Sequence, residues 1–240
     1  MFVSRTMDGS DGPNLALFAS LTMKAVIFDL DGTLINNEWV YDQAYCVVLK
    51  SLDISCEQLN HTPGIGLEEN WKRMIRDLNI NQTSAELAKK TRDIYLQNIS
   101  AIKLRDGARE LIFHLKRRQT LTILATSTTR EVATQVLHQI DAENLFDFTV
   151  FGDEVEHKKP APDIFLKAMD KSEILPREAI VIEDSAAGVE AGKEAGAKVI
   201  ALKTDWYTRD QLARADFIAD NFDQILKLIK TEKTLDHLPV

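Results

Sequence analysis

The chain has 240 residues, of which 45% are hydrophobic, so it can bury a sizeable core as one large domain or two small ones. Its formal net charge of −8 at pH 7 argues against nucleic acid or an anionic membrane as the main partner, because both favour a basic surface. No apolar stretch approaches the roughly 20 residues that a membrane-spanning helix requires.

Residues 1–22 mix acids, glycines and a proline with a short apolar patch. Two acids precede that patch, which is wrong for the start of a secretory signal. We therefore expect a flexible extension ahead of a domain that starts at Met23.

The stretch 23–34, MKAVIFDLDGTL, joins an apolar run to two closely spaced acids. Residues 25–28 have the β-branched and aromatic composition of a strand buried on both faces of a parallel sheet. Asp29 and Asp31 follow where that strand should end, and Gly32 lets the backbone turn sharply. Because carboxylates are costly inside a sheet, we expect both to open into a crevice at the strand's carboxyl end, where α/β sheets bind ligands.

The next part of the chain shows a helical pattern, with apolar residues at spacings of three and four and no intervening strand pattern. Pro63, Gly64 and Gly66 mark a loop within it. An all-helical insertion of this kind predicts a separate small domain that lies over the strand ends. The predicted helices span residues 38–52, 67–78 and 84–99.

The only cysteines, Cys46 and Cys56, have no CxxC spacing and no matching histidine cluster. Neither a disulfide framework nor a zinc site is therefore indicated, and the sequence favours a reduced, cytoplasmic setting.

Strands and helices alternate from residue 105 onward, which predicts an α/β fold with a doubly wound, mostly parallel sheet. We divide the chain into a core domain of residues 23–36 and 104–240 and a helical domain of residues 37–103. The expected strands are 121–125, 148–151, 179–182, 198–202 and a short one near 217, and the expected helices are 107–118, 130–140, 161–169, 186–195 and 222–230.

Four polar clusters each come after an apolar strand, and the carboxyl ends of parallel strands share one edge of a sheet, so the clusters should meet in one crevice. Crowded carboxylates need a cation among them, and oxygen ligands select a hard ion such as Mg²⁺. Lysine, hydroxyls and helix N-termini suit anionic oxygens, so the set predicts phosphoryl transfer, with a carboxylate nucleophile that splits the reaction in two. The clusters are Asp29 with Asp31, residues 126–129, residues 158–160, and Glu183 with Asp184.

Taken together, four segments resemble the motifs of the haloacid dehalogenase-like superfamily, in the branch with a helical cap after the first motif: DLDGTL, ILATS, KPAPDIF and VIEDSAAGVEAGKEAG. The resemblance covers nearly everything from residue 23 to about residue 229. It implies a Rossmann-like core with a cap, and a Mg²⁺-dependent phosphatase that cleaves a small phosphorylated metabolite through an aspartyl-phosphate. We expect a monomer or a weak homodimer.

Carried over by residue, the resemblance implies that Asp29 is the nucleophile and that Asp31 is the general acid and base. Lys159 would steady the nucleophile and the transferring group, and it is chosen over Lys158 because the family's lysine directly precedes the proline. The implied phosphoryl contacts are Leu30, Thr126, Ser127 and Lys159.

The resemblance also implies a Mg²⁺ site. Asp184 would bind the ion beside the carboxylate of Asp29 and the backbone carbonyl of Asp31. Glu183 is either a further ligand or a supporting partner.

The sequence also bears on three alternative functions. Asp31 argues against dehalogenation, because a halide leaving group needs no proton. The serious rival is a β-phosphoglucomutase-like mutase, which needs a second anion site in the cap, and the cap loop of residues 61–69 contains no Lys or Arg. A non-catalytic protein that binds a phosphorylated metabolite would not need both a nucleophile and a proton carrier.

Two features of the helical insertion bear on substrate choice. Asn36, Asn37 and Glu38 stand where many relatives carry Asp-Ser-Glu, which removes a negative charge beside the expected site. Several side chains could shape a substrate pocket, although aromatic residues at helical spacing are more often part of a core. These are Trp39, Tyr41, Trp71, Lys72 and Arg73.

Overall fold

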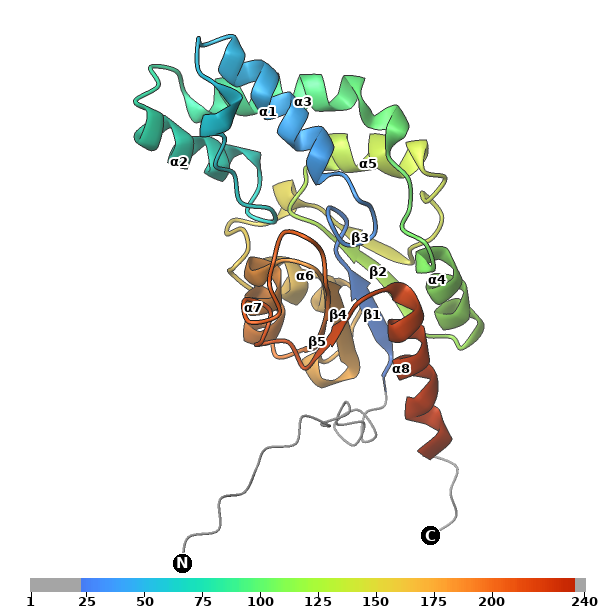
Figure 1. The fold of residues 1–240 in the computed structure, drawn as a ribbon. Helices are drawn as coiled ribbons and strands as arrows, with labels where there is room; N and C mark the ends of the chain where they lie inside the picture. The colour runs from blue at the N-terminus through green and yellow to red at the C-terminus, as the bar shows by residue number, and fades with distance from the viewer. Residues whose placement is uncertain (1–22, 236–240) are drawn as a thin grey trace, which may run out of the picture.

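The computed structural model describes residues 23–235, and the expected extension of residues 1–22 lies outside them. Within the described chain, six parallel strands form a sheet in the order β3-β2-β1-β4-β5-β6, which confirms the predicted α/β fold (Figure 1). The strands are β1 (Ala25–Phe28), β2 (Leu121–Ala125), β3 (Phe148–Val150), β4 (Ala179–Glu183), β5 (Lys198–Leu202) and β6 (Phe217–Ala219).

Strand β1 lies in the middle of the sheet, between β2 and β4, and all four of its residues are fully buried. Because successive side chains of a strand point to opposite faces, Val26 and Phe28 join one hydrophobic cluster, whereas Ala25 and Ile27 join the other. This burial on both faces explains the uninterrupted apolar run in the sequence.

Helices cover both faces of the sheet (Figure 1). Buried side chains of α4 (Ala108–Arg117), α5 (Arg130–Gln139) and α8 (Phe222–Leu235) belong to the cluster of Phe28. Those of α6 (Asp163–Lys171) and α7 (Ala186–Glu194) belong to the cluster of Ile27. The sheet is therefore doubly wound, and no helix within residues 23–235 is long and apolar enough to cross a membrane.

The inserted helices α1 (Glu38–Lys50), α2 (Leu67–Leu78) and α3 (Ser84–Gln97) lie beyond the carboxyl ends of the strands (Figure 1). Aromatic side chains hold them together: Tyr41 stacks on Tyr95 with ring centroids 4.0 Å apart, and Tyr45 contacts Trp71 at 5.4 Å. All four rings are buried. Tyr41 and Trp71 are therefore part of a core, which is the ordinary role of aromatic residues at helical spacing.

The structure adds short 3-10 turns that the sequence analysis did not predict, because three residues are too few to show a period. They are Cys56–Gln58, Ile99–Ala101, Gly152–Glu154 and Pro176–Glu178. The long elements differ from prediction mainly at their ends: α6, for example, starts at Asp163, after Pro162, rather than at residue 161.

Cys46 in α1 and Cys56 in the following 3-10 turn form a disulfide. The expectation of no disulfide is therefore wrong. Helix α1 ends at Lys50 and the chain turns back, which brings the two Cα atoms within 5.0 Å, and a ten-residue spacing does not reveal this reversal. The sequence analysis predicted a reduced setting because it expected no disulfide. The cysteine pair does not support that setting, which stays a prediction.

The two-sided burial of the sheet generates a stability prediction. Val181→Ala in β4 removes a fully buried side chain, so we expect a loss of about 2 kcal/mol or more in the free energy of unfolding, measured by urea denaturation. The matched control is Val47→Ala in α1, where Val47 is 51% exposed and alanine has the higher helix propensity, so its effect should stay within about 0.5 kcal/mol. Equal losses would contradict this account of the core.

Candidate active site

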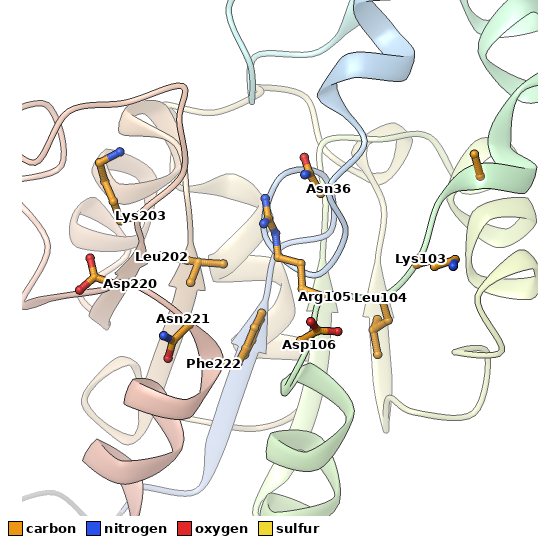
Figure 2. Close-up of a pocket in the computed structure, with 11 residues that line it drawn as sticks. Asn36, Lys103, Leu104, Arg105, Asp106, Leu202, Lys203, Asp220, Asn221 and Phe222 are labelled. Carbon is orange, nitrogen blue, oxygen red and sulfur yellow. The ribbon is translucent and has the colours of Figure 1, made fainter.

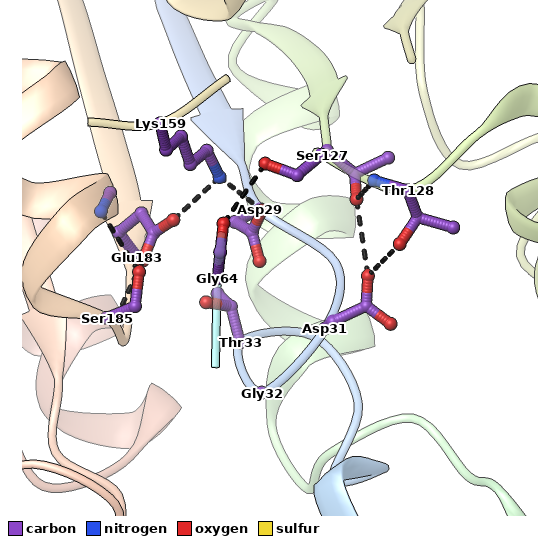
Figure 3. Close-up of polar contacts among 12 residues, drawn as sticks. Asp29, Asp31, Gly32, Thr33, Gly64, Ser127, Thr128, Lys159, Glu183 and Ser185 are labelled. Carbon is purple, nitrogen blue, oxygen red and sulfur yellow. Dashed lines mark hydrogen bonds and ion pairs between the residues drawn. The ribbon is translucent and has the colours of Figure 1, made fainter. Parts of the chain in front are cut away.

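Asp29 and Asp31 lie in the loop that leaves β1 at the centre of the sheet edge (Figure 3). The Asp29 N–H donates to the Ile182 carbonyl at 3.0 Å, and the residue is only 5% exposed. Gly32 has a φ of +77°, and a side chain there would collide with the carboxylate of Asp184. The glycine therefore permits both the turn and the close approach of the first and fourth motifs.

A buried lysine joins two carboxylates at this edge (Figure 3). Lys159 Nζ lies 2.5 Å from Asp29 Oδ1 and 2.6 Å from Glu183 Oε1, and its side chain is 1% exposed. Burial lowers the pKa of Lys159, but the charges of Asp29 and Glu183 more than offset this, so the net pKa is raised and the amine stays charged. Burial raises the pKa of Asp29 well above its usual value, although Lys159 opposes that shift.

Glu183 has both oxygens engaged. Oε1 accepts from Lys159, and Oε2 accepts from the N–H groups of Asp184 and Ser185, each at 2.7 Å, and from Ser185 Oγ at 2.9 Å. A Cβ at Gly188 would overlap this carboxylate, so the absent side chain there makes room for it. Of the two roles left open for Glu183, the geometry favours the supporting one.

Asp184 offers one unsatisfied oxygen. Thr33 Oγ1 donates to Oδ1 at 2.9 Å, whereas Oδ2 is buried and has no hydrogen-bond partner. Burial, reinforced by the charges of Glu183 and Glu38, raises the pKa of Asp184 well above its usual value. A buried carboxylate oxygen without a donor is costly, so this position suits a cation.

The residues present fit a magnesium ion of the kind that is bound by few protein oxygens. Asp29 and Asp184 can supply carboxylates and Asp31 a backbone carbonyl, a hard-oxygen set that leaves room for water and a phosphate oxygen. Among the described residues, no group of three or more His, Cys, Asp and Glu side chains converges on one metal position.

The side chain of Asp31 is held by three donors. Asn37 Nδ2 donates to Oδ1 at 2.6 Å, and the hydroxyls of Thr128 and Thr126 donate to Oδ2 at 2.6 and 3.3 Å. Asn37 Oδ1 also accepts from the Gly32 N–H at 3.2 Å. Asn37, which stands where many relatives carry serine, thus contacts Asp31 directly. Sequence reasoning assigned no such role to Asn37 or Thr128, because neither lies next to Asp31 in the chain.

The other expected phosphoryl contacts differ in accessibility. Thr126 is fully buried and its hydroxyl faces Asp31, whereas Ser127 is half-buried and its hydroxyl donates to the Gly64 carbonyl at 3.2 Å. The side chain of Leu30 is fully buried, so this residue can contribute only through its backbone. Of the two hydroxyl residues, Ser127 is the more exposed, and Figure 3 shows its hydroxyl directed toward Gly64.

A loop of the helical insertion, residues 61–66, is seated on the sheet edge. The Tyr207 hydroxyl donates to the Pro63 carbonyl at 3.0 Å, and the Cα of Gly64 lies so close to Ser185 that a side chain there would collide with it. Arg73 of α2 donates to Thr62 Oγ1 at 2.6 Å. The loop itself has no lysine or arginine, but Arg73 of α2 lies beside it.

A cavity of about 370 Å³ lies where both linkers of the helical insertion meet the core (Figure 2). Asn36, Lys103, Lys203 and the start of α8 at Phe222 line it, and none of the carboxylates described above does. Arg105, also in its wall, donates from Nε to the Gly32 carbonyl at 2.9 Å. The cavity therefore lies between the linkers and the core, away from these carboxylates. The hydrogen bond of Arg105 connects the second linker to the loop that contains Asp29 and Asp31.

Comparisons with known proteins agree with this geometry. A protein-family model described as haloacid dehalogenase-like hydrolase matches residues 26–202. The chain is 34% identical over 177 residues to a phosphorylated carbohydrates phosphatase of Thermotoga maritima, an alignment that covers 72% of this chain and 82% of that protein.

The fold of the chain is also similar to those of solved structures. CbbY from Rhodobacter sphaeroides, in complex with phosphate, matches with a TM-score of 0.76 and 25% identity over 85% of this chain and 96% of that one. A mutant of CbbY in complex with xylulose-(1,5)bisphosphate matches with a TM-score of 0.74 and 25% identity, over 83% and 95% of the two chains.

The buried lysine generates a prediction. Lys159→Met leaves Asp29 and Glu183 buried without their cation, so we expect a loss of about 3–5 kcal/mol in the free energy of unfolding at pH 7. An acid with a raised pKa destabilises the fold increasingly as the pH rises above its unfolded value, near 4 for Asp29, so the loss should be smaller at pH 5 than at pH 7.

Urea denaturation at both pH values measures this difference. Lys89→Met is the matched control, because Lys89 is an exposed residue of α3 paired with Asp93, and its loss should stay below about 1 kcal/mol. Losses of similar size in the two variants would show that Lys159 does not balance buried charge.

Proposed function

This chain belongs to the haloacid dehalogenase-like hydrolases, and we propose that it is a Mg²⁺-dependent phosphatase of a small phosphorylated carbohydrate, acting through an aspartyl-phosphate. Its enzyme class is that of the phosphoric monoester hydrolases. The observation that carries the proposal is the arrangement around Asp29: a buried lysine on one of its oxygens and an unsatisfied Asp184 oxygen at the same sheet edge.

The proposed nucleophile is Asp29. Lys159 occupies Oδ1, which leaves the other oxygen for attack on phosphorus. The fixed positive charge of Lys159 also favours the charge that spreads over the transferring phosphoryl oxygens. Ser127 is proposed as a hydroxyl donor to one of these oxygens, and the Leu30 backbone as a further contact.

Asp31 is the proposed general acid and base. Its donors Asn37 and Thr128 orient the carboxyl group, so that it protonates the leaving oxygen and later takes a proton from the attacking water. Proton transfer of this kind is worth about 10²–10⁴ in rate.

We propose that Asp29, Asp184 and the Asp31 carbonyl hold Mg²⁺, with Glu183 as support. When bound, the ion supplies positive charge that balances these acids and the phosphate.

The helical insertion is proposed to be a cap that closes over the site. The contacts of Gly64 and Pro63 with Ser127, Ser185 and Tyr207 support a closed arrangement that keeps stray water from the intermediate. The hinges would be the two linkers near residues 35–37 and 103–106.

A carbohydrate substrate is supported by the phosphorylated carbohydrates phosphatase and by the xylulose bisphosphate complex of the CbbY mutant. Arg73, which donates to Thr62 of the cap loop, is a candidate cation for a distal anionic group, and it weakens the argument against a mutase that rested on the loop alone. We keep the phosphatase as the proposal, because the cap loop itself contains no lysine or arginine.

The first test is phosphate release from a panel of sugar phosphates, sugar bisphosphates, phosphoglycolate and nucleotides, with Mg²⁺ and with a chelator. We expect Mg²⁺-dependent release that falls at least about 10³-fold in Asp29→Asn, because an amide is not a nucleophile. Circular dichroism of the variant checks the fold. Interconversion of sugar phosphates without net release would identify a mutase, and tight binding without turnover would identify a binding protein.

The role of Asp31 gives a second test, based on the leaving group. Asp31→Asn should lower kcat/KM about 10²–10⁴-fold for a sugar phosphate, whose leaving oxygen needs a proton, but much less for p-nitrophenyl phosphate, which leaves without one. Equal losses on the two substrates would argue that Asp31 is not the acid of the first step.

A further inference from the structure

His61, at the start of the cap loop, is enclosed between two carboxylates. Its side chain is 4% exposed, with Nε2 3.2 Å from Glu38 Oε2 and Nδ1 3.2 Å from Asp42 Oδ1. Glu38 and Asp42 are one helical turn apart in α1, at its start beside the first linker. Both ring nitrogens of His61 therefore face acceptors on the same helix.

The faces and edge of the imidazole are also in contact with aromatic rings. Tyr45 of α1 stacks on it with ring centroids 5.0 Å apart, and Trp206, in the loop that follows β5, meets it edge-on at 5.4 Å. His61 thus touches both the helical insertion and the core.

The residues that follow His61 make the contacts that close the loop on the site. The Pro63 carbonyl accepts from Tyr207, and the Gly64 carbonyl accepts from Ser127. On the α2 side, Asn70 exchanges hydrogen bonds with the backbone of Thr62 at 2.7 and 2.9 Å. Asn70 Nδ2 also donates to the Gly66 carbonyl at 3.1 Å, so the loop is held by His61 at its start and by Asn70 at both Thr62 and Gly66.

Two acceptors around one imidazole require a shared proton. A neutral imidazole has only one N–H, so it can donate to only one of two carboxylates. Hydrogen bonds to both acids therefore require one more proton, either on the second ring nitrogen or on one of the carboxyl groups. Burial lowers the pKa of His61, although Asp42 opposes this, and burial together with Asp31 and Asp42 raises the pKa of Glu38 to about 8. The proton is thus retained at neutral pH and lost above it.

The surroundings offer few other charges to replace that proton. From α1 the ring faces Tyr45 as well as the two acids, and from the core it faces the neutral indole of Trp206. Arg73 donates to Thr62, one residue along, and the Tyr207 hydroxyl donates to the Pro63 carbonyl. On the core side, Glu38 also feels the charges of the acids Asp31 and Asp184.

We propose that His61 is a positioning residue for the phosphatase reaction: by bridging Glu38 and Asp42 it holds residues 62–66 so that Gly64 closes over Ser127 and Ser185. The inference rests on the proposed function for its catalytic consequence, but the anchoring of the loop stands on geometry alone. When the shared proton is lost, two carboxylates repel across an uncharged ring and the loop loosens.

The test compares His61→Gln and Glu38→Gln with the control His138→Gln. His138 is also paired with an acid, Glu143, but its side chain is 79% exposed on α5, away from the loop. The first readout is hydrogen exchange of the peptide that covers residues 62–66, which needs no substrate. We expect at least about tenfold faster exchange in His61→Gln than in the wild type or the control.

The second readout is kcat and KM of phosphate release across pH 6 to 9.5, on the best substrate of the panel. We expect kcat/KM to fall about tenfold or more in His61→Gln and less in Glu38→Gln. The decline of the wild type above pH 8 should be absent or displaced in Glu38→Gln, which a merely structural role would not change.

Unchanged loop exchange in His61→Gln would overturn the inference, whatever the activity. So would faster exchange combined with wild-type kcat/KM and pH profile, because the loop would then be anchored without consequence for the reaction. A wild-type protein that releases no phosphate from any ester contradicts the proposed function instead, and the exchange readout alone then decides on the anchor.

Discussion

The structure depends on one buried ion pair network, in which Lys159 lies between Asp29 and Glu183. A lysine brought out of water is costly by itself, and so is each carboxylate, but the three groups offset one another at distances of 2.5 and 2.6 Å. Much of the local architecture follows from keeping these charges together. Glu183 is held by the N–H groups of Asp184 and Ser185, just before α7, and Gly188 leaves the space that its carboxylate occupies.

A second constraint is that carboxylates outnumber cations at this edge. Asp31 is satisfied by neutral donors, from Asn37 and Thr128, while Asp184 keeps an oxygen with no donor. The same edge therefore contains an acid whose two oxygens both accept hydrogen bonds and an acid with one unsatisfied oxygen, in line with the different roles that we propose for Asp31 and Asp184. The loop of residues 61–66 contacts this edge through the backbone carbonyls of Pro63 and Gly64.

The sequence predicted the sheet, its helices and the convergence of four motifs, because buried strands and amphipathic helices have clear periods and parallel strands share an edge. It did not predict the contacts that depend on chain reversal. The Cys46–Cys56 disulfide, Asn37 on Asp31 and His61 between Glu38 and Asp42 all join residues whose proximity is set by how α1 leaves its linker and how the following loop returns. Trp71 shows a different limit of sequence reasoning. Its spacing is compatible with a substrate pocket and with a core, and only its full burial in the structure identifies it as a core residue.

The place of β1 in the sheet has a consequence for biosynthesis. This strand is made first among the six, yet its neighbours are β2 and β4, and Ala25 pairs with Ala179. Such long sequence separations slow folding, because the chain must lose conformational entropy in closing a long loop before the stabilising contacts can form. During translation, Asp29 therefore has to wait for Lys159 and Glu183 to leave the ribosome, and an apolar strand with unpaired edges is exposed meanwhile. The arrangement that gathers the chemistry at the centre of the sheet also makes the nascent chain dependent on protection from aggregation until most of it has been synthesised.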